Sequence, residues 1–202
     1  SIGLYSKAHT VIASISTILK FRGDGVRAEQ FAREALAIRR ALYGDRHPDV
    51  ANSMADVGSV AFDNGRVEEA EKLLRDALAM TRSIYPDGHE DVGYRMSGLA
   101  RLLMKKGEYA EAEQLLLGDL ALLMRMHGGD HVMVATANET LGILNRQRGT
   151  FDRAERFTRE AHRLFAHLYP DPANLLRLRT GIVLGDVMRA QGKLAQAESL
   201  LT

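Results

Sequence analysis

The chain has 202 residues, of which 46% are hydrophobic and 6% aromatic, and it contains no cysteine and no tryptophan. Its 27 Lys and Arg against 26 Asp and Glu give a formal net charge of +1, whereas a duplex nucleic-acid binder usually carries a larger basic excess. Without cysteine the chain can form neither disulfides nor thiolate metal sites. No stretch reaches the roughly 18 apolar residues of a membrane span, and the first ten residues lack the layout of a signal peptide. We therefore expect a cytoplasmic protein that binds neither nucleic acid nor membrane.

Taken in chain order, the sequence predicts paired helices. The first covers residues 8–22, where apolar residues recur at helical spacing, and it ends before Gly23. A second runs from Val26 to Tyr43, and Gly44 is predicted to supply a left-handed C-cap. Further first helices are predicted at about 49–64, 91–106, 133–148 and 174–191, and second helices at about 67–84, 109–126, 151–168 and from 195 onward. Short turns make sequential helices antiparallel, so the predicted fold class is all-α.

A repeat of 42 residues organises these helices. Ala-Glu pairs begin at Ala28, Ala70, Ala112 and Ala154, at spacings of 42, 42 and 42 residues (70−28, 112−70, 154−112), and another begins 43 later at Ala197. A fixed period indicates a stack of similar units, none of which buries its apolar face alone. We expect one array over residues 1–202, with units at about 8–44, 49–86, 91–128, 133–170 and 174–202. Because the last helix has barely begun, we also expect a fragment of a longer protein.

Each first helix ends at a glycine, and counting back from it predicts the core. Aliphatic residues stand eight and five positions before that glycine, and a small residue stands seven before it, which allows two helices to approach closely. The aliphatic columns are Ile15, Val57, Leu99, Leu141, Leu184 and Ile18, Val60, Leu102, Leu144, Val187, and the small column is Ser16, Gly58, Ala100, Gly142, Gly185.

This pattern resembles the tetratricopeptide repeat (TPR), with Gly-x-x-x-x-Ala at the turn and a further alanine in the second helix at Ala35, Ala77 and Ala161. The period of 42 rather than 34, together with the loop motif His47-Pro48, resembles the kinesin-light-chain subtype. The resemblance covers about residues 8–202.

The resemblance implies a right-handed α-solenoid of stacked antiparallel helix pairs. It also implies a non-catalytic protein–protein interaction scaffold that binds a peptide or a partner domain in a groove lined by the first helices. Kinesin light chains carry Asn on that groove face, where this chain has Ala55, Ser97, Glu139 and Ile182. The cargo-adaptor function is therefore not carried over.

In this family the groove is lined by positions 13, 10, 6, 3 and 2 before the turn glycine, and here those columns hold more basic than acidic residues. Such a face fits an acidic peptide with one or two large side chains. The alternative, which the sequence leaves open, is a set of Lys and Arg that only solvate the surface. The candidate groove residues are Lys20, Phe62, Arg101, Met104, Lys105, Glu139, Ile143, Arg146, Arg179 and Arg189.

The sequence gives little support for catalysis or metal binding. His47, His89 and His131 also recur every 42 residues, but stacked helices lie about 8–10 Å apart while a zinc ligand lies about 2 Å from its ion. We predict instead that these histidines bond Asp49, Asp91 or nearby backbone. Phosphate-loop and zincin motifs are absent from the sequence. We therefore expect no enzyme, no cofactor and no metal.

Two other functions remain open from the sequence. The first is a regulatory sensor, in which the same solenoid binds a small peptide or metabolite and controls an effector domain outside this chain. The second is self-assembly into a homo-oligomer through the terminal repeats, because the last helix would leave Leu194, Leu200 and Leu201 uncovered and repeat arrays need polar caps.

Overall fold

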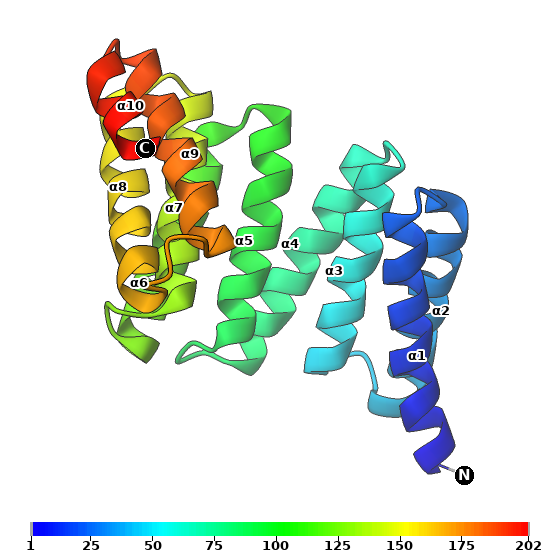
Figure 1. Cartoon of the computed structure of the whole chain (residues 1–202). Coiled ribbons are helices and arrows are strands. Elements are labelled where there is room, and N and C mark those ends of the chain that lie inside the picture. The colour runs from blue at the N-terminus through cyan, green and yellow to red at the C-terminus, as the bar shows by residue number, and fades with distance from the viewer. Residues whose placement is uncertain (1, 202) are drawn as a thin grey trace. The chain divides into compact units, whose positions relative to one another are not determined.

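A computed structural model describes residues 2–201 of the chain, and the side chains of residues 11–200. Within that range the chain forms ten α-helices and no strand (Figure 1). The predicted all-α class is confirmed. No helix among the described residues combines the length and the apolar character needed to cross a membrane.

The helices alternate between first and second members of a pair. The first members are α1 (Ile2–Phe21), α3 (Pro48–Asp63), α5 (Glu90–Lys106), α7 (Val132–Gln147) and α9 (Leu175–Ala190). The second members are α2 (Gly25–Tyr43), α4 (Val67–Ile84), α6 (Tyr109–His127), α8 (Phe151–Leu168) and α10 (Leu194–Leu201). The bounds of α4 and α8 match the predicted ranges. The largest difference is in α1, which begins at Ile2 and not at residue 8.

The chain divides into two compact units, residues 1–102 (unit 1) and residues 103–202 (unit 2). The division falls inside α5, so each unit contains part of that helix. The single array that the 42-residue period predicts over residues 1–202 stays a prediction.

In unit 1, the core joins α1, α2 and α3. Leu19, Ala28 and Val60 form a buried cluster, and partly buried Ile15 and Phe31 pack against it. Ser16, from the predicted small column, is 4% exposed, and its hydroxyl donates to the carbonyl of Ala28 at 2.7 Å. The small side chain and the alanine of the Ala-Glu pair therefore lie where the two helices are in direct contact.

In unit 2, one core cluster joins α6, α7 and α8, and a second joins α9 and α10. The first consists of Leu123, Val134, Ala135, Ala137, Leu164 and Phe165. The second consists of Leu184, Met188 and Ala197, with Leu200 packed against it. Most predicted core columns are confirmed, and Val57, Leu141, Leu144 and Val187 have no exposed surface.

Four apolar residues in α1 and α10 differ in how their exposure compares with its prediction. Ile18 was predicted as core and is 52% exposed, and the neighbouring Leu19 is the buried residue that packs against Ala28 and Val60. Leu194 is 60% exposed, as predicted, whereas Leu200 is covered by packing against α9. The side chain of Leu201 lies outside the described residues.

The loops between repeats use a recurring helix cap. Each loop histidine accepts a hydrogen bond at Nδ1 from the backbone N–H two residues later: Asp49 for His47 (3.1 Å), Asp91 for His89 (3.2 Å) and Met133 for His131 (3.2 Å). The same rings stack at 4.2–4.3 Å on the ring four residues earlier, Tyr43, Tyr85 and His127. The prediction that these histidines bond nearby backbone is confirmed.

The loop before α9, which has no histidine, places Asn174 in the cap position, where its side chain accepts from the N–H groups of Leu176 and Arg177.

The C-cap glycine of α2, Gly44, has a positive φ, as predicted, but its ψ of 178° is extended and not left-handed helical. That region of backbone space is open almost only to glycine.

Buried carboxylates join consecutive repeats. Glu29 of α2 pairs with Arg66 and accepts from Asn64 at 2.9 Å. Glu113 of α6 pairs with Arg148 at 3.0 Å and Arg153 at 2.7 Å. These two glutamates follow the alanine of the Ala-Glu pair, and each finds a cation one repeat further along the chain.

Candidate functional site

The predicted groove residues fall into two sets, one in each unit. Unit 1 holds Lys20 on α1, Phe62 on α3 and Arg101 on α5. Unit 2 holds Met104, Lys105, Glu139, Ile143, Arg146, Arg179 and Arg189. We call each set, with the residues of the same helices that surround it, the first-helix face of its unit.

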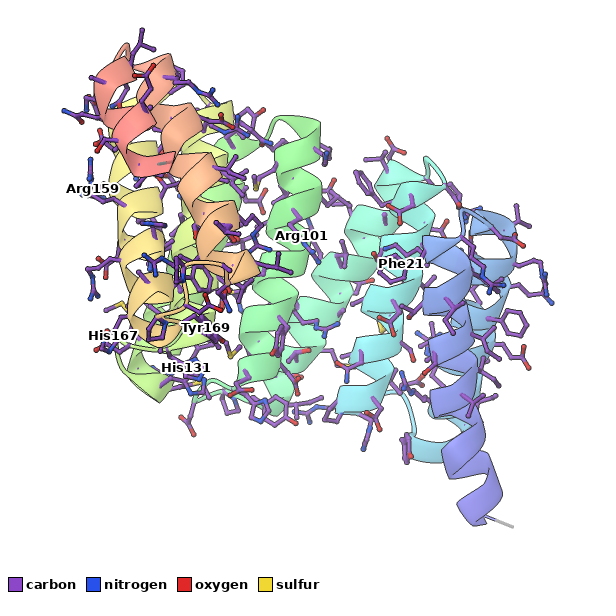
Figure 2. All side chains as sticks on the ribbon, in the orientation of Figure 1. Phe21, Arg101, His131, Arg159, His167 and Tyr169 are labelled. Carbon is purple, nitrogen blue, oxygen red and sulfur yellow. The ribbon has the colours of Figure 1, made fainter. Side chains whose placement is uncertain are left out.

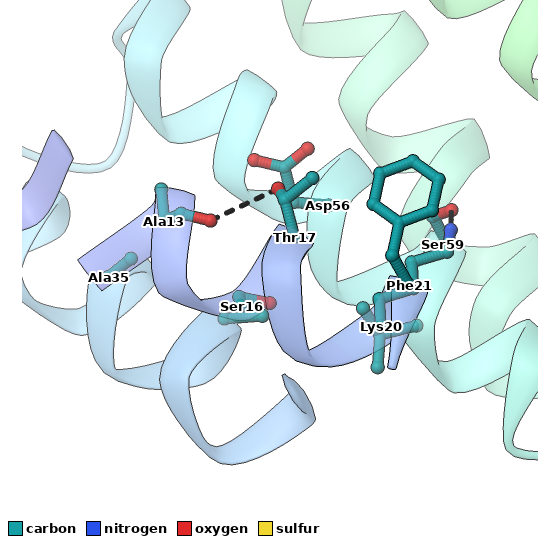
Figure 3. Close-up of a pocket in the computed structure, with 10 residues that line it drawn as sticks. Ala13, Ser16, Thr17, Lys20, Phe21, Ala35, Asp56 and Ser59 are labelled. Atoms are coloured by element: carbon teal, nitrogen blue, oxygen red, sulfur yellow. Dashed lines mark hydrogen bonds between the residues drawn. The ribbon is translucent and has the colours of Figure 1, made fainter. Parts of the chain in front are cut away.

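Lys20 is held in place by neighbours on α3. Its Nζ lies 2.9 Å from the carboxylate of Asp63 and donates to the hydroxyl of Ser59 at 2.6 Å. Because an ion pair already occupies this ammonium, Lys20 contributes less free positive charge to the face than its position in the sequence suggests. Figure 3 shows the Lys20–Ser59 bond at one side of a pocket.

The pocket has a volume of about 200 Å³ and lies between α1, α2 and α3. Its apolar lining comes from Ala13, Ala32, Ala35, Val60 and Phe21, and its polar lining from Ser16, Thr17, Lys20, Asp56 and Ser59. The hydroxyls of Ser16 and Thr17 donate hydrogen bonds to backbone carbonyls.

Asp56 differs from these groups. Within the described part of the chain its carboxylate makes no hydrogen bond or ion pair, and it carries no dashed line in Figure 3. The side chain reaches solvent, yet the surrounding protein raises the pKa of Asp56, because desolvation outweighs the attraction of Arg95, Arg39 and Lys20.

Arg95 of α5 also has unused bonding capacity. Its Nε is buried and has no acceptor among the described residues. Burial lowers the pKa of the Arg95 guanidinium, while the charges of Asp56 and Asp91 oppose that effect. Arg101 lies on the same helix, is exposed, and forms no ion pair with another described residue (Figure 2).

In unit 2, two predicted groove residues bind each other. Arg179 of α9 donates from Nε to the carboxylate of Glu139 on α7 at 2.9 Å, and a second bond forms through its terminal nitrogen. Glu139 is only 4% exposed. This bidentate pair joins consecutive first helices and cancels one positive charge of the predicted basic face.

The other candidates in unit 2 differ in accessibility. Met104 is 9% exposed and lies in the core, and Arg189 pairs with Asp186. Lys105 is exposed and Arg146 is half-buried, and neither forms an ion pair within the described chain. The Nε of Arg146 is buried without an acceptor, as it is in Arg95.

The sequence analysis missed Asp56 and Arg95. They stand 9 residues before Gly65 and 12 before Gly107 (65−56, 107−95), outside the columns used to predict the groove. For Asp56 the available signal was a charged residue directly beside the core column at Val57, and Arg95 had no such signal. Among the described side chains, no group of three or more His, Cys, Asp and Glu is arranged to hold a metal ion.

Several solved structures share this fold. BtubC (BKLC) from P. vanneervenii superposes with a TM-score of 0.82 at 23% identity, over 94% of this chain and 75% of that chain. A putative kinesin light chain of P. anserina with nearly identical TPR-like repeats gives 0.81 at 20% identity, over 95% and 90% of the two chains. The Rap conjugation gene regulator of plasmid pLS20, in complex with the Phr* peptide, gives 0.70 at 15% identity, over 96% and 51%.

The curated proteins yield no match to this sequence. The family model described as tetratricopeptide repeat matches residues 9–83 and 94–167, which is well over half of the chain. Two further models with the same description match residues 61–121 and 178–201. The chain therefore belongs to the tetratricopeptide repeat family, as its 42-residue period and turn glycines predicted.

Proposed function

We propose that this chain is a non-catalytic protein–protein interaction module that binds an acidic peptide or partner segment on its first-helix faces. The observation that carries the proposal is the pair of guanidinium groups of Arg95 and Arg146. In both, a buried Nε–H has no acceptor among the described residues. An unsatisfied buried donor costs about 1–3 kcal/mol, and a ligand carboxylate or carbonyl that accepts from the guanidinium after a change of its rotamer offsets part of that cost.

The surroundings of these arginines support an anionic ligand with apolar side chains. Arg101 in unit 1 and Lys105 in unit 2 are exposed cations, and neither has an ion-pair partner in the described chain. Half-buried Phe62 and Ile143 offer apolar contact on the same helices as the predicted groove columns. Carboxylates that meet arginine form charge-assisted hydrogen bonds, which are stronger than neutral ones.

Peptide display against the full chain tests this proposal. We expect enrichment of peptides that contain Asp or Glu, and fluorescence anisotropy should show at least tenfold weaker binding to Arg101→Glu or Arg146→Glu, because each reversal replaces attraction by repulsion. Lys72→Glu on α4 is the matched control, since Lys72 is exposed on a second helix and forms no ion pair with a described residue. Equal affinities for the wild type and the reversal variants, or enrichment without acidic residues, would contradict the proposal.

A second candidate is a peptide-responsive regulatory sensor. The likeness to the Rap regulator solved with the Phr* peptide favours it, although this chain spans only 51% of that protein. A sensor of this kind binds one specific peptide, and that peptide raises the melting temperature as its concentration increases. Self-assembly is a third candidate, favoured by the exposed Leu175, Leu178 and Leu194, and a mass that rises with concentration in light scattering would support it.

A further inference from the structure

Asp56 lies among three cations that come from three different helices. Lys20 on α1 lines the same pocket as Asp56, and Lys20, Arg39 on α2 and Arg95 on α5 all act on Asp56 electrostatically. Two more carboxylates belong to the same cluster, because Asp63 pairs with Lys20 and Asp91 acts on Arg95. With Asp56 ionised, these six groups sum to zero (three positive, three negative), and without its charge they sum to +1.

The cations of this cluster are not equally available. Lys20 is held by Asp63 and Ser59, and Arg39 is buried, donating to the hydroxyl of Ser53 at 2.6 Å. Arg95 alone among the three retains a buried N–H without an acceptor in the described structure. An anionic group that enters this face therefore meets Arg95 as a donor with unused capacity and Asp56 as a like charge without an ion pair in the described structure.

We propose that Asp56 sets the affinity of the unit 1 first-helix face for anionic side chains: ionised Asp56 opposes their binding to Arg95, and removal of its charge strengthens that binding. This inference rests on the proposed function, because it concerns the same face and the same class of ligand. Because Asp56 is exposed, the dielectric constant of water applies, and loss of one like charge about 3–6 Å away then changes affinity roughly three- to tenfold.

The protonation of Asp56 gives the face a dependence on pH. Desolvation raises the pKa of Asp56 above its ordinary value of 3.8, so the carboxyl takes up a proton at a higher pH than an exposed aspartate does. As the pH falls, Asp56 becomes neutral and acidic ligands bind more tightly. By linkage, a bound anion raises the pKa of Asp56 further, whereas a bound cation would lower it.

The probe is a peptide that carries sulfotyrosines, because sulfate esters stay ionised over the pH range used. Binding of this peptide to the full chain is measured at pH 7 and pH 5 for the wild type, Asp56→Asn and Asp76→Asn. Asp76 is exposed on the second helix α4, so its variant makes the same change in net charge away from the first-helix face. An unsulfated peptide of the same sequence controls for apolar contacts.

We expect Asp56→Asn to bind the sulfated peptide three- to tenfold more tightly than the wild type at pH 7, and Asp76→Asn to bind like the wild type. The gain on lowering the pH should shrink in Asp56→Asn, and addition of Arg95→Gln should remove the tighter binding. Equal gains in both Asp→Asn variants, or no gain in Asp56→Asn, would overturn the inference. If the wild type binds the peptide and Arg101→Glu abolishes binding while Asp56→Asn changes nothing, the inference fails and the proposed function stands. If no variant binds, both fail.

Discussion

Single carboxylates link one repeat to the next, and Glu155 shows this most strongly. Its side chain is 14% exposed, and it lies 2.6 Å from Nζ of Lys193, which belongs to the following repeat, and 2.5 Å from Arg159 on its own helix. Hydrogen bonds from Lys193 and Arg159 hold the pKa of Glu155 at about 2, against an ordinary value of 4.5. Folding therefore favours the ionised form of Glu155.

This shift predicts a specific acid sensitivity. Because the folded-state pKa lies below the unfolded one, the contribution of Glu155 to the free energy of unfolding is present above about pH 4.5 and is lost as the pH falls towards 2. Urea unfolding between pH 6 and pH 3 should show a smaller loss of stability in Glu155→Gln than in the wild type. Glu34→Gln is the control, since Glu34 is exposed and makes no ion pair with any described residue. Parallel curves for the wild type and Glu155→Gln would contradict the assignment.

At the scale of the helix pair, the small column decides how closely two helices approach. A methyl group added at Gly142 of α7 would lie 2.4 Å from Cγ2 of Thr158 on α8, and 3.2 Å from the backbone nitrogen of the same residue. A methyl group added at Gly98 of α5, in contrast, would have no neighbouring atom within 4 Å. The two glycines therefore have different physical roles although both lie within first helices.

We predict opposite effects of alanine at these two positions. Gly142→Ala should lower the free energy of unfolding by about 1–2 kcal/mol, because overpacking outweighs the gain in helix propensity. Gly98→Ala should raise it by up to about 1 kcal/mol, since only the propensity changes. Chemical denaturation measures both.

A second-site variant tests the cause. Thr158→Ser removes the Cγ2 methyl and keeps the hydroxyl that donates to Ala154. It should therefore restore part of the stability in the Gly142→Ala background. A double variant no more stable than Gly142→Ala alone would exclude this contact as the source of the strain.

For the whole molecule, the helices that pack most extensively against each other follow one another in the chain, such as α1 with α2, α3 with α4 and α7 with α8. In repeat proteins with such local contacts, stability is close to a sum of unit and nearest-neighbour terms. Hydrogen exchange of Gly142→Ala should then show the largest loss of protection in α7 and α8 and the smallest in α1 and α2. Equal loss in every helix would instead show a single cooperative unit.

The sequence predicted the helices well because their causes are local. A 42-residue period, apolar spacing and turn glycines determine which residues form helices and which face the core, and among the aliphatic columns Ile18 is the exposed exception. The capping role of the loop histidines was also predictable, because Nδ1 needs only the backbone two residues ahead.

The candidate site was less predictable because charge partners depend on distant residues. Counting columns placed Glu139 and Arg179 on the groove, but it did not show that they pair across 40 residues of sequence. Nor did it show that Met104 is buried, or that Asp56 and Arg95 belong to the same charged cluster. The spacing of a residue from the turn glycine predicts which face of its helix it lies on. Its ion-pair partner depends on the side-chain rotamers of residues on neighbouring helices, which the spacing does not predict.

The glutamates that pair with the following repeat have a consequence for how a repeat can be added to the chain. Glu29, Glu113 and Glu155 each reach a basic residue supplied by the repeat that follows. A tandem duplication of a 42-residue segment that contains one of these three glutamates would therefore supply a carboxylate for the unit after it and a cation for the unit before it. Such an insertion creates no orphaned charge at either new junction, so growth by whole-repeat duplication preserves the connections that a shorter insertion would break.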